Sequence, residues 1–311
     1  MSSVSIEDLK KYYGPVHALG GLNLEVAPGT VFGFLGPNGA GKTTTLRILT
    51  GLARPTSGQA RVAGVDILKD GPKLARSIGH LPEEPAFYTW MTPREFLDYL
   101  GRLYGLSSTE RAARARELLA QVHLEEVSKR RIGGFSRGMR QRLGVAAALI
   151  HHPQVLFLDE PASALDPAGR KEMLELIESL RGQCTVVMST HILADVERVC
   201  DEVGIIAKGR MLVQSRREQL LERYAVPAFE VSGDDRPALA RWADELRKVS
   251  WVSSVAAENG TLHITVKDLQ AAKRELLPKA VHAGLVLNRY EEVRPSLEDV
   301  FLKLVGTENA L

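Results

Sequence analysis

A glycine-rich loop with one lysine and a run of threonines lies between two apolar stretches, within Phe32 to Leu49. It fits the pattern G-x-x-x-x-G-K-S/T, in which backbone N–H groups and a helix N-terminus bind phosphates. In such a loop Lys42 reaches the terminal phosphates and the Thr43 hydroxyl binds Mg²⁺. The residues expected to form it are Gly36, Pro37, Asn38, Gly39, Ala40, Gly41, Lys42, Thr43 and Thr44. An apolar segment, Val31 to Leu35, precedes the loop, so the strand–loop–helix context that phosphate binding requires is present.

Two adjacent carboxylates, Asp159 and Glu160, end an apolar segment that begins at Val155. A strand that is buried in a core would not end in two negative charges without partners. Near a phosphate loop, Asp159 would bind Mg²⁺ directly or through water, and Glu160 would polarise the water that attacks a γ-phosphate. Without that loop, the same pair would be interpreted as a solvated strand end.

A second anion-binding device is indicated by FSRGMRQR, where Ser136 and Gly138 open a predicted helix. A serine hydroxyl, a glycine backbone and the positive end of a helix dipole all favour an anion. Taken alone, the segment is explained better as an ordinary helix N-cap. Because one nucleotide needs one phosphate cradle, two kinds of cradle in one chain suggest a composite site.

The elements that must position these residues alternate between strand-like and helix-like up to about residue 215. This alternation predicts an α/β domain around a sheet with parallel strands, to which 155–159 and Thr185 to Thr190 contribute buried strands. The pattern turns helical after Trp90, with capping boxes that begin at Thr92 and Ser107. We therefore predict a domain of residues 1–215 with a helical insert at about 90–150.

A change of pattern after about residue 225 predicts a second domain, residues 226–311. Its segments suggest β-α-β-β-α-β and a closing helix, which is a small α+β domain of ferredoxin-like type. The expected strands are 228–233, 250–258, 261–266 and 285–293, and the expected helices are 236–248, 269–282 and 295–304.

Composition indicates which partners and which cellular setting to expect for the chain. The chain has 311 residues, 44% of them hydrophobic, and a net charge of +2, so no nucleic acid partner is expected. Cys184 and Cys200 share no metal-ligand spacing, which favours two reduced thiols. Neither a signal peptide nor a run of eighteen apolar residues is found, so a membrane span is expected to come from another chain.

Four ordered motifs together resemble the ATP-binding subunit of ABC transporters: GPNGAGKTT, FSRGMRQR, VLFLDEP with SALDP, and MSTHILADVERVCD. The resemblance covers about the first two thirds of the chain. It implies a P-loop NTPase fold of the ABC type that binds ATP and Mg²⁺ and hydrolyses ATP. It also implies a separate transmembrane permease, a dimer with a second copy or a paralogous subunit, and a cytoplasmic position at the inner face of the membrane.

The resemblance also implies roles for residues outside the phosphate loop. Tyr13 would stack on adenine, with its neighbour Tyr12 as the rival and an ordinary strand aromatic as the alternative. Ser136 and Gly138 match the signature motif, which contacts the γ-phosphate of ATP held by the opposite subunit. Arg137 replaces a usual glycine there, as in a branch of bacterial exporter subunits.

Further correspondences concern the hydrolytic residues. Asp159 and Glu160 resemble the Walker B pair, Asp166 the D-loop aspartate, and His191 the switch histidine that reaches the γ-phosphate. Glu83 stands where the family has a glutamine, so a carboxylate faces Mg²⁺ or water and an amide donor is lost. The permease is expected to dock near Glu83 and the helical insert.

The segment from Arg294 to Gly306 is similar to the tail of bacterial exporter subunits for drugs, antibiotics and lipids. The resemblance therefore predicts an ATP-hydrolysing subunit that powers export through a permease. The alternative is a soluble ABC ATPase that acts on ribosomes or DNA, although the two linked halves or long coiled coil of those chains are not found. For the small domain, ligand binding, dimerisation and regulation all stay open.

Overall fold

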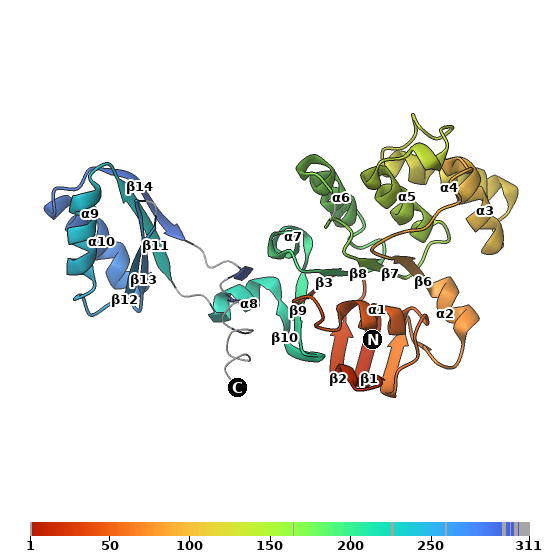
Figure 1. Cartoon of the computed structure of the whole chain (residues 1–311), viewed down its shortest axis with the longest axis horizontal. Coiled ribbons are helices and arrows are strands. Elements are labelled where there is room, and N and C mark those ends of the chain that lie inside the picture. The colour runs from red at the N-terminus through yellow and green to blue at the C-terminus, as the bar shows by residue number, and fades with distance from the viewer. Residues whose placement is uncertain are drawn as a thin grey trace. The chain divides into compact units, whose positions relative to one another are not determined.

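The computed structural model describes residues 2–163, 165–224, 227–258, 260–293, 297–298, 300–301 and 304. The chain divides into two compact units, Met1–Arg217 and Glu218–Leu311, which are labelled by element in Figure 1. Each unit has a hydrophobic core of its own.

Unit 1 is built around a six-stranded sheet in the order β10-β9-β3-β8-β7-β6. Its strands are β3 (Val31–Leu35), β6 (Ile78–Leu81), β7 (Val155–Asp159), β8 (Thr185–Thr190), β9 (Glu202–Ala207) and β10 (Arg210–Arg216). All neighbours pair in parallel except β10, which is antiparallel to β9. Every residue of β3, β7 and β8 is buried, which explains the apolar sequence of β3 and of β7 before Asp159, while β8 also buries Thr185, Ser189 and Thr190.

A second sheet of unit 1 has four antiparallel strands in the order β2-β1-β4-β5 and was not among the predicted elements. Its strands are β1 (Val4–Tyr13), β2 (Val16–Val26), β4 (Ser57–Val62) and β5 (Val65–Asp66). Helix α1 (Lys42–Leu49) contacts β2 and β4 of this sheet and β7 of the other, so it lies between the two. Its Leu46, Ile48 and Leu49 belong to the core that the sheets share.

The predicted helical insert is present as α3 (Pro93–Leu103), α4 (Ser108–Gln121) and α5 (Arg137–Leu149), with a 3-10 turn at Ile132–Gly134. The two predicted capping boxes are confirmed, because Thr92 and Ser107 each exchange hydrogen bonds with the glutamate three residues later. The other helices of unit 1 are α2 (Gly71–Ser77), α6 (Pro167–Ser179) and α7 (Leu193–Val199), whereas α8 (Arg217–Tyr224) belongs to unit 2 from its second residue on.

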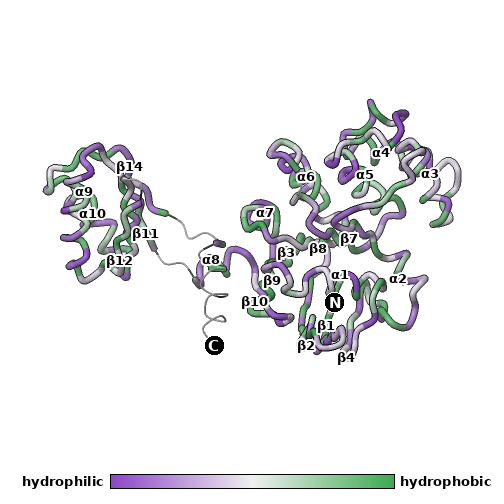
Figure 2. Tube along the Cα trace, viewed as in Figure 1, coloured by the Kyte–Doolittle hydropathy of each residue, from purple (hydrophilic) through white to green (hydrophobic). Residues whose placement is uncertain are grey.

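Unit 2 has the predicted β-α-β-β-α-β sequence, with an antiparallel sheet in the order β12-β13-β11-β14. Its elements are β11 (Ala228–Gly233), α9 (Arg236–Leu246), β12 (Val252–Glu258), β13 (Thr261–Val266), α10 (Leu269–His282) and β14 (Leu287–Val293). Both helices cover one face of the sheet (Figure 1), and hydrophobic and hydrophilic residues alternate along each (Figure 2). This is the predicted ferredoxin-like arrangement. Much of the predicted closing helix, 295–304, lies outside the described residues.

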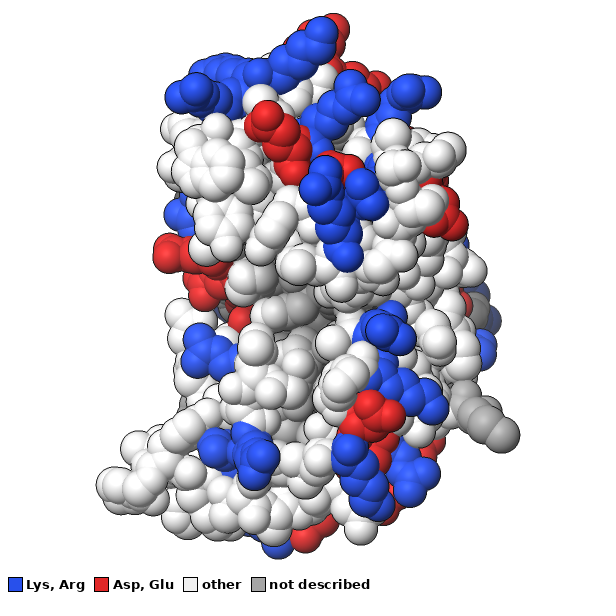
Figure 3. Space-filling view, turned by 90° about the vertical axis from the view of Figure 1, so that its right-hand side faces the viewer, with Lys and Arg blue, Asp and Glu red and all other residues white. Residues whose placement is uncertain are grey.

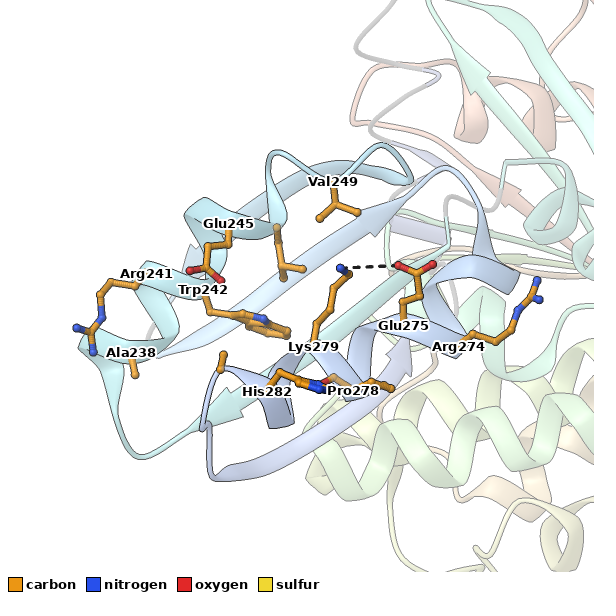
Figure 4. A pocket seen from close by; sticks show the side chains of 12 residues that line it. Ala238, Arg241, Trp242, Glu245, Val249, Arg274, Glu275, Pro278, Lys279 and His282 are labelled. Atoms are coloured by element: carbon orange, nitrogen blue, oxygen red, sulfur yellow. Dashed lines mark hydrogen bonds and ion pairs between the residues drawn. The ribbon is translucent and has the colours of Figure 1, made fainter.

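A groove of about 830 Å³ runs between α9 and α10 of unit 2 (Figure 4). Trp242 lies in it between the two helices, and Lys279 forms an ion pair with Glu275 at a distance of 3.8 Å. None of the predicted site residues lines this groove.

Two further predictions concern the whole described chain. Cys184 and Cys200 are free thiols, both buried, as expected for reduced cysteines. No helix in the described part of the chain combines the length and the hydrophobicity needed to cross a membrane.

Candidate active site

The glycine-rich loop joins the central strand β3 to α1, and two of its glycines are required by close approaches. A Cβ atom at Gly36 would lie 2.4 Å from the Ile206 carbonyl oxygen. Gly41, the N-cap of α1, has a φ of 107°, and a Cβ there would lie 2.8 Å from the Ala18 carbonyl oxygen. Only glycine tolerates this packing and this backbone conformation, so the loop stays close to β2 and β9.

Lys42 is buried at the start of α1, with 6% of its surface exposed. Its ammonium donates to the carbonyl oxygens of Gly36 at 2.7 Å and Pro37 at 3.4 Å, and lies 3.7 Å from Glu160 Oε1. Burial lowers the pKa of Lys42, and the nearby carboxylates oppose that shift. The loop therefore holds a cation whose partners are its own carbonyls and one carboxylate.

Asp159, at the end of β7, meets Thr43 of α1 and Ser189 of β8. The Thr43 hydroxyl donates to Asp159 Oδ1 at 3.3 Å, and the Ser189 hydroxyl donates to the same oxygen. Asp159 is only 4% exposed, so these hydroxyls compensate for much of the lost solvation of its carboxylate. Ser189 was not among the predicted site residues, although the polar end of the segment at Thr185 to Thr190 marked that position as one where sites occur.

Glu160 has a left-handed backbone, with a φ of 48°. Its N–H donates to the carbonyl oxygen of Ser189 at 3.1 Å, and its side chain is 9% exposed. His191 Nδ1 lies 3.0 Å from both carboxylate oxygens of Glu160. Such a backbone conformation is costly for a residue other than glycine and is common at functional sites. It turns the Glu160 side chain towards Lys42 and His191.

A pocket of about 300 Å³ opens over this loop. Its lining includes ten of the predicted site residues: Asn38, Gly39, Ala40, Gly41, Lys42, Thr43, Thr44, Glu83, Glu160 and His191. The side chain of Glu83 is exposed at this pocket and its charge acts on Lys42. Val16, His17 and Ala18 also line it and were not predicted, because nothing in their residue types indicates phosphate chemistry.

Tyr13 is not part of the pocket lining. It ends β1 with 47% of its surface exposed, and Lys11 Nζ lies 4.6 Å from its ring centroid. Its neighbour Tyr12 packs on the ring of His17 at 4.4 Å, and His17 does line the pocket. Both candidates for an adenine contact therefore lie next to the pocket rather than in it.

Ser136, Gly138 and Asp166 also lie outside the pocket lining. Ser136 caps α5 by accepting from the Met139 N–H at 3.2 Å, and Asp166 caps α6 by accepting from the Gly169 N–H at 3.3 Å. A Cβ atom at Gly138 would make only ordinary contact, at 3.5 Å, with Leu165. Within one copy of the chain these residues form two helix starts and no composite site with the loop.

Hard oxygen donors are the groups at this site that suit Mg²⁺. The Thr43 hydroxyl and the Asp159 carboxylate meet at 3.3 Å beside the loop, so the residues present fit the ion. Among the described residues, no cluster of three or more His, Cys, Asp or Glu side chains could hold a metal. A magnesium ion here would complete its shell with phosphate oxygens and water, as is usual for this ion.

Comparison with protein families matches both units. The family described as ABC transporter matches residues 19–163. The family described as ATP-binding protein DrrA1-3-like, C-terminal domain, matches residues 216–305.

Relatives match over nearly the full length of the chain. The bacitracin transport ATP-binding protein BcrA of Bacillus licheniformis is 42% identical over 306 residues, covering 97% of this chain and 97% of that protein. The daunorubicin resistance ATP-binding protein DrrA3 of Streptomyces coeruleorubidus is 34% identical over 313 residues, covering 99% and 97%. The chain belongs to the ABC transporter ATP-binding proteins.

Solved structures agree with this family. A dimeric structure of a post-hydrolysis state of the ATP-binding cassette MJ0796 bound to ADP and Pi has a TM-score of 0.62 and 26% identity, covering 68% of this chain and 98% of that one. Unit 1 of this ABC transporter ATP-binding protein is therefore a P-loop cassette, as the motifs predicted. The protein is an ATP hydrolase. The pocket lined by the loop, Glu160 and His191, with Asp159 beside it at Thr43, is the candidate for its nucleotide site.

Proposed function

We propose that this protein hydrolyses ATP to power a separate membrane permease that exports an antibiotic, a drug or a lipid-like compound. The observation that carries the hydrolytic part is the Glu160 carboxylate, which lies 3.0 Å from His191 and 3.7 Å from Lys42 at the phosphate pocket. The names of BcrA and DrrA3 support export of antibiotics or drugs. Both are named for transport or resistance, which does not favour the alternative action on ribosomes or DNA.

Different residues of the pocket would bind the phosphates and carry out the hydrolytic step. The loop N–H groups and Lys42 bind the phosphates, and Lys42 exchanges its bonds to Gly36 and Pro37 for bonds to phosphate oxygens. Glu160 accepts a proton from the attacking water, while His191 holds the carboxylate in position and donates towards the γ-phosphate. The new water-to-phosphorus bond replaces the bond between the β- and γ-phosphates, and ADP and phosphate leave.

Magnesium would be held by Thr43 and Asp159. When bound, the ion would neutralise charge on the β- and γ-phosphate oxygens, which assists phosphoryl transfer. The hydroxyl of Ser189 keeps the Asp159 carboxylate oriented towards Thr43. Glu83 would face the ion through water, and its negative charge would also act against the phosphates of ATP.

A second copy, or a paralogous subunit, would supply the residues that one pocket does not contain. The starts of α5 and α6, with Ser136, Gly138 and Asp166, lie away from their own pocket and include exposed residues. We propose that they close over the γ-phosphate bound by the opposite copy, and that Tyr13 stacks on the adenine. The dimeric structure of MJ0796 supports this arrangement, since that cassette is a dimer.

A docking site for the permease is supported by a second hollow of about 300 Å³, which lies between the end of α1, β6 and the helical insert. Leu52 at its edge is 68% exposed, and Leu100 of α3 and the C-cap residue Tyr104 line it. The side of unit 1 that carries α2 and α3 shows charged side chains above and below an uncharged strip (Figure 3). We propose that a permease segment packs here and draws the protein to the membrane.

A complementation experiment tests the shared pocket. In a homodimer of Lys42→Ala or of Ser136→Ala, both sites lack one residue. In a mixed dimer of the two variants, one site combines Lys42 of one copy with Ser136 of the other and is complete. We expect each variant to be inactive alone and the mixture to recover ATPase activity. The activity of the wild type per molecule should fall on dilution.

Ser107→Ala is the matched control, because it removes the N-cap of α4 at a similar cost in helix stability, about 1 kcal/mol, away from the pocket. It should retain activity without complementation. Activity that is independent of dilution, with no recovery in the mixture, would contradict the shared pocket.

A further inference from the structure

An ion pair joins α6 to α7 next to the hydrolytic residues. Arg170 Nε lies 2.6 Å from Asp195 Oδ1. The side chain of Asp195 is only 2% exposed and that of Arg170 is 32% exposed. A carboxylate buried to this extent needs its cationic partner, so the pair holds the two helices in one arrangement.

Each member of this pair lies in the first turn of its helix, and each helix closely follows a predicted site residue. Asp166 caps α6 four residues before Arg170. His191 leads into α7 four residues before Asp195, and the N–H of Ile192 is fixed by the Thr190 hydroxyl at 3.0 Å. The ion pair therefore connects the start of α6 to the segment that presents His191 to Glu160.

The carboxylate of Asp195 interacts electrostatically with that of Glu160. Burial raises the pKa of Asp195, the Arg170 guanidinium opposes this shift, and the negative charge of Glu160 adds to it. The negative charges of Asp195 and Glu160 therefore lie near enough to interact.

We propose that Arg170 is a positioning residue for ATP hydrolysis: through Asp195 it holds the start of α7, and with it His191, in place against Glu160. This inference rests on the proposed function. Without the pair, His191 would still be present but its ring would no longer be fixed 3.0 Å from the carboxylate. Because phosphate binding depends on the loop and Lys42, the loss should affect the chemical step and not ATP affinity.

The chain offers a matched control on the same two helices. Arg198, three residues after Asp195 on α7, pairs at 3.1 Å with Glu175, five residues after Arg170 on α6. This pair is exposed, with 39% and 51% of its side chains accessible. Removing it also loosens α6 against α7, but away from His191, and exposed pairs contribute little to stability.

The experiment measures kcat, KM and ATP affinity of the full-length chain for Arg170→Gln, Asp195→Asn, Arg170→Lys and Arg198→Gln. For the first two variants we expect kcat to fall about ten- to a hundredfold, as a small misplacement of reacting groups does, with ATP affinity unchanged. Arg170→Lys keeps the charge and should recover part of kcat. Arg198→Gln should match the wild type.

The proposal would be overturned if Arg170→Gln and Asp195→Asn had the same kcat as Arg198→Gln. It would also be overturned if these two variants lost as much ATP affinity as kcat, or if Arg170→Lys had a kcat no higher than that of Arg170→Gln. Asp195→Asn keeps the shape of the buried side chain, so it provides a folded test if Arg170→Gln does not fold. A wild-type protein without ATPase activity would refute the proposed function instead, so the two failures are distinguishable.

Discussion

Unit 1 and unit 2 each pack helices on a sheet around an apolar core, yet only unit 1 gathers reactive side chains at one place. In unit 1, β3, β7 and β8 are adjacent and parallel, so their carboxyl ends meet at one edge of the sheet. The loop, Asp159 with Glu160, and His191 all follow those ends. The direction of the strands thus creates the site, and the residue types then give it chemistry.

Unit 2 distributes its charged residues differently. Its strands are antiparallel, so neighbouring strands end at opposite edges. Its charges form pairs across the sheet, such as Glu230 with Arg289 at 2.9 Å and with His263 at 3.4 Å. Such cross-strand pairs stabilise a sheet surface. Unit 2 is therefore best regarded as an accessory domain, and we propose that it takes no part in the chemistry.

The strongest test of this contrast is Glu160→Gln. The amide cannot accept the proton of the attacking water, so the turnover rate should fall about 10²- to 10⁴-fold while ATP binding is retained. Single-turnover hydrolysis and ATP affinity, measured together, separate the two effects. Glu178→Gln, an exposed change on α6, is the control. Undiminished hydrolysis in Glu160→Gln would refute the assigned base.

Trp242→Ala tests the independence of unit 2. The indole is 2% exposed and lies in the core of that unit, so its loss should destabilise unit 2 by about 3–5 kcal/mol. ATP affinity should not change, since every described residue that lines the nucleotide pocket belongs to unit 1. Thermal unfolding and nucleotide titration measure these effects, with Val281→Ala, 65% exposed, as the control. A parallel loss of ATP affinity would show that the units are coupled.

Lys42→Ala removes activity in the homodimer, as expected above, and its separate effect on ATP binding should be smaller than the effects of the two preceding variants. Loss of a charge-assisted hydrogen bond to phosphate should weaken ATP affinity about ten- to a hundredfold. Lys69→Ala, with a side chain that is 78% exposed, should bind ATP like the wild type. Calorimetric titration with a non-hydrolysable ATP analogue measures both. Equal affinities would count against the phosphate loop.

Glu83→Gln should produce the smallest change. It removes one exposed negative charge near the phosphates, so ATP affinity should rise at low salt by no more than about 1 kcal/mol. The rise should vanish at high salt, because the charge is screened. Glu84→Gln, an exposed neighbour, is the control. Weaker binding by Glu83→Gln would instead indicate that the carboxylate itself supports the bound magnesium.

Much of the fold could be predicted because the central strands are buried on all sides. The segments at 31–35 and 155–159 are almost wholly apolar, and the segment at 185–190 has an apolar centre, Val186 to Met188. The observed bounds of all three agree with the prediction. The antiparallel sheet of unit 1 could not be predicted in the same way. Asp8, with a φ of 45°, and register shifts in β1 interrupt the alternation that identifies a half-buried strand.

The candidate site was predictable where a motif fixes both residue type and spacing. The loop from Gly36 to Thr44 is continuous in sequence, so its geometry is local. Ser189 and His17 were missed because their importance depends on which strands become neighbours, and that is a property of the tertiary structure. The role of Ser136 stays a prediction, since one copy of the chain does not place it near its own pocket.

The partners of Lys42 have a consequence for nucleotide exchange. Its ammonium donates to the carbonyl oxygens of Gly36 and Pro37, and these bonds offset part of the cost of burying the cation. An incoming triphosphate replaces those internal ligands, and the net free energy is the difference between two sets of bonds. The same carbonyl oxygens lower the free-energy cost of ADP release, because the Lys42 ammonium can donate to them again as the product leaves.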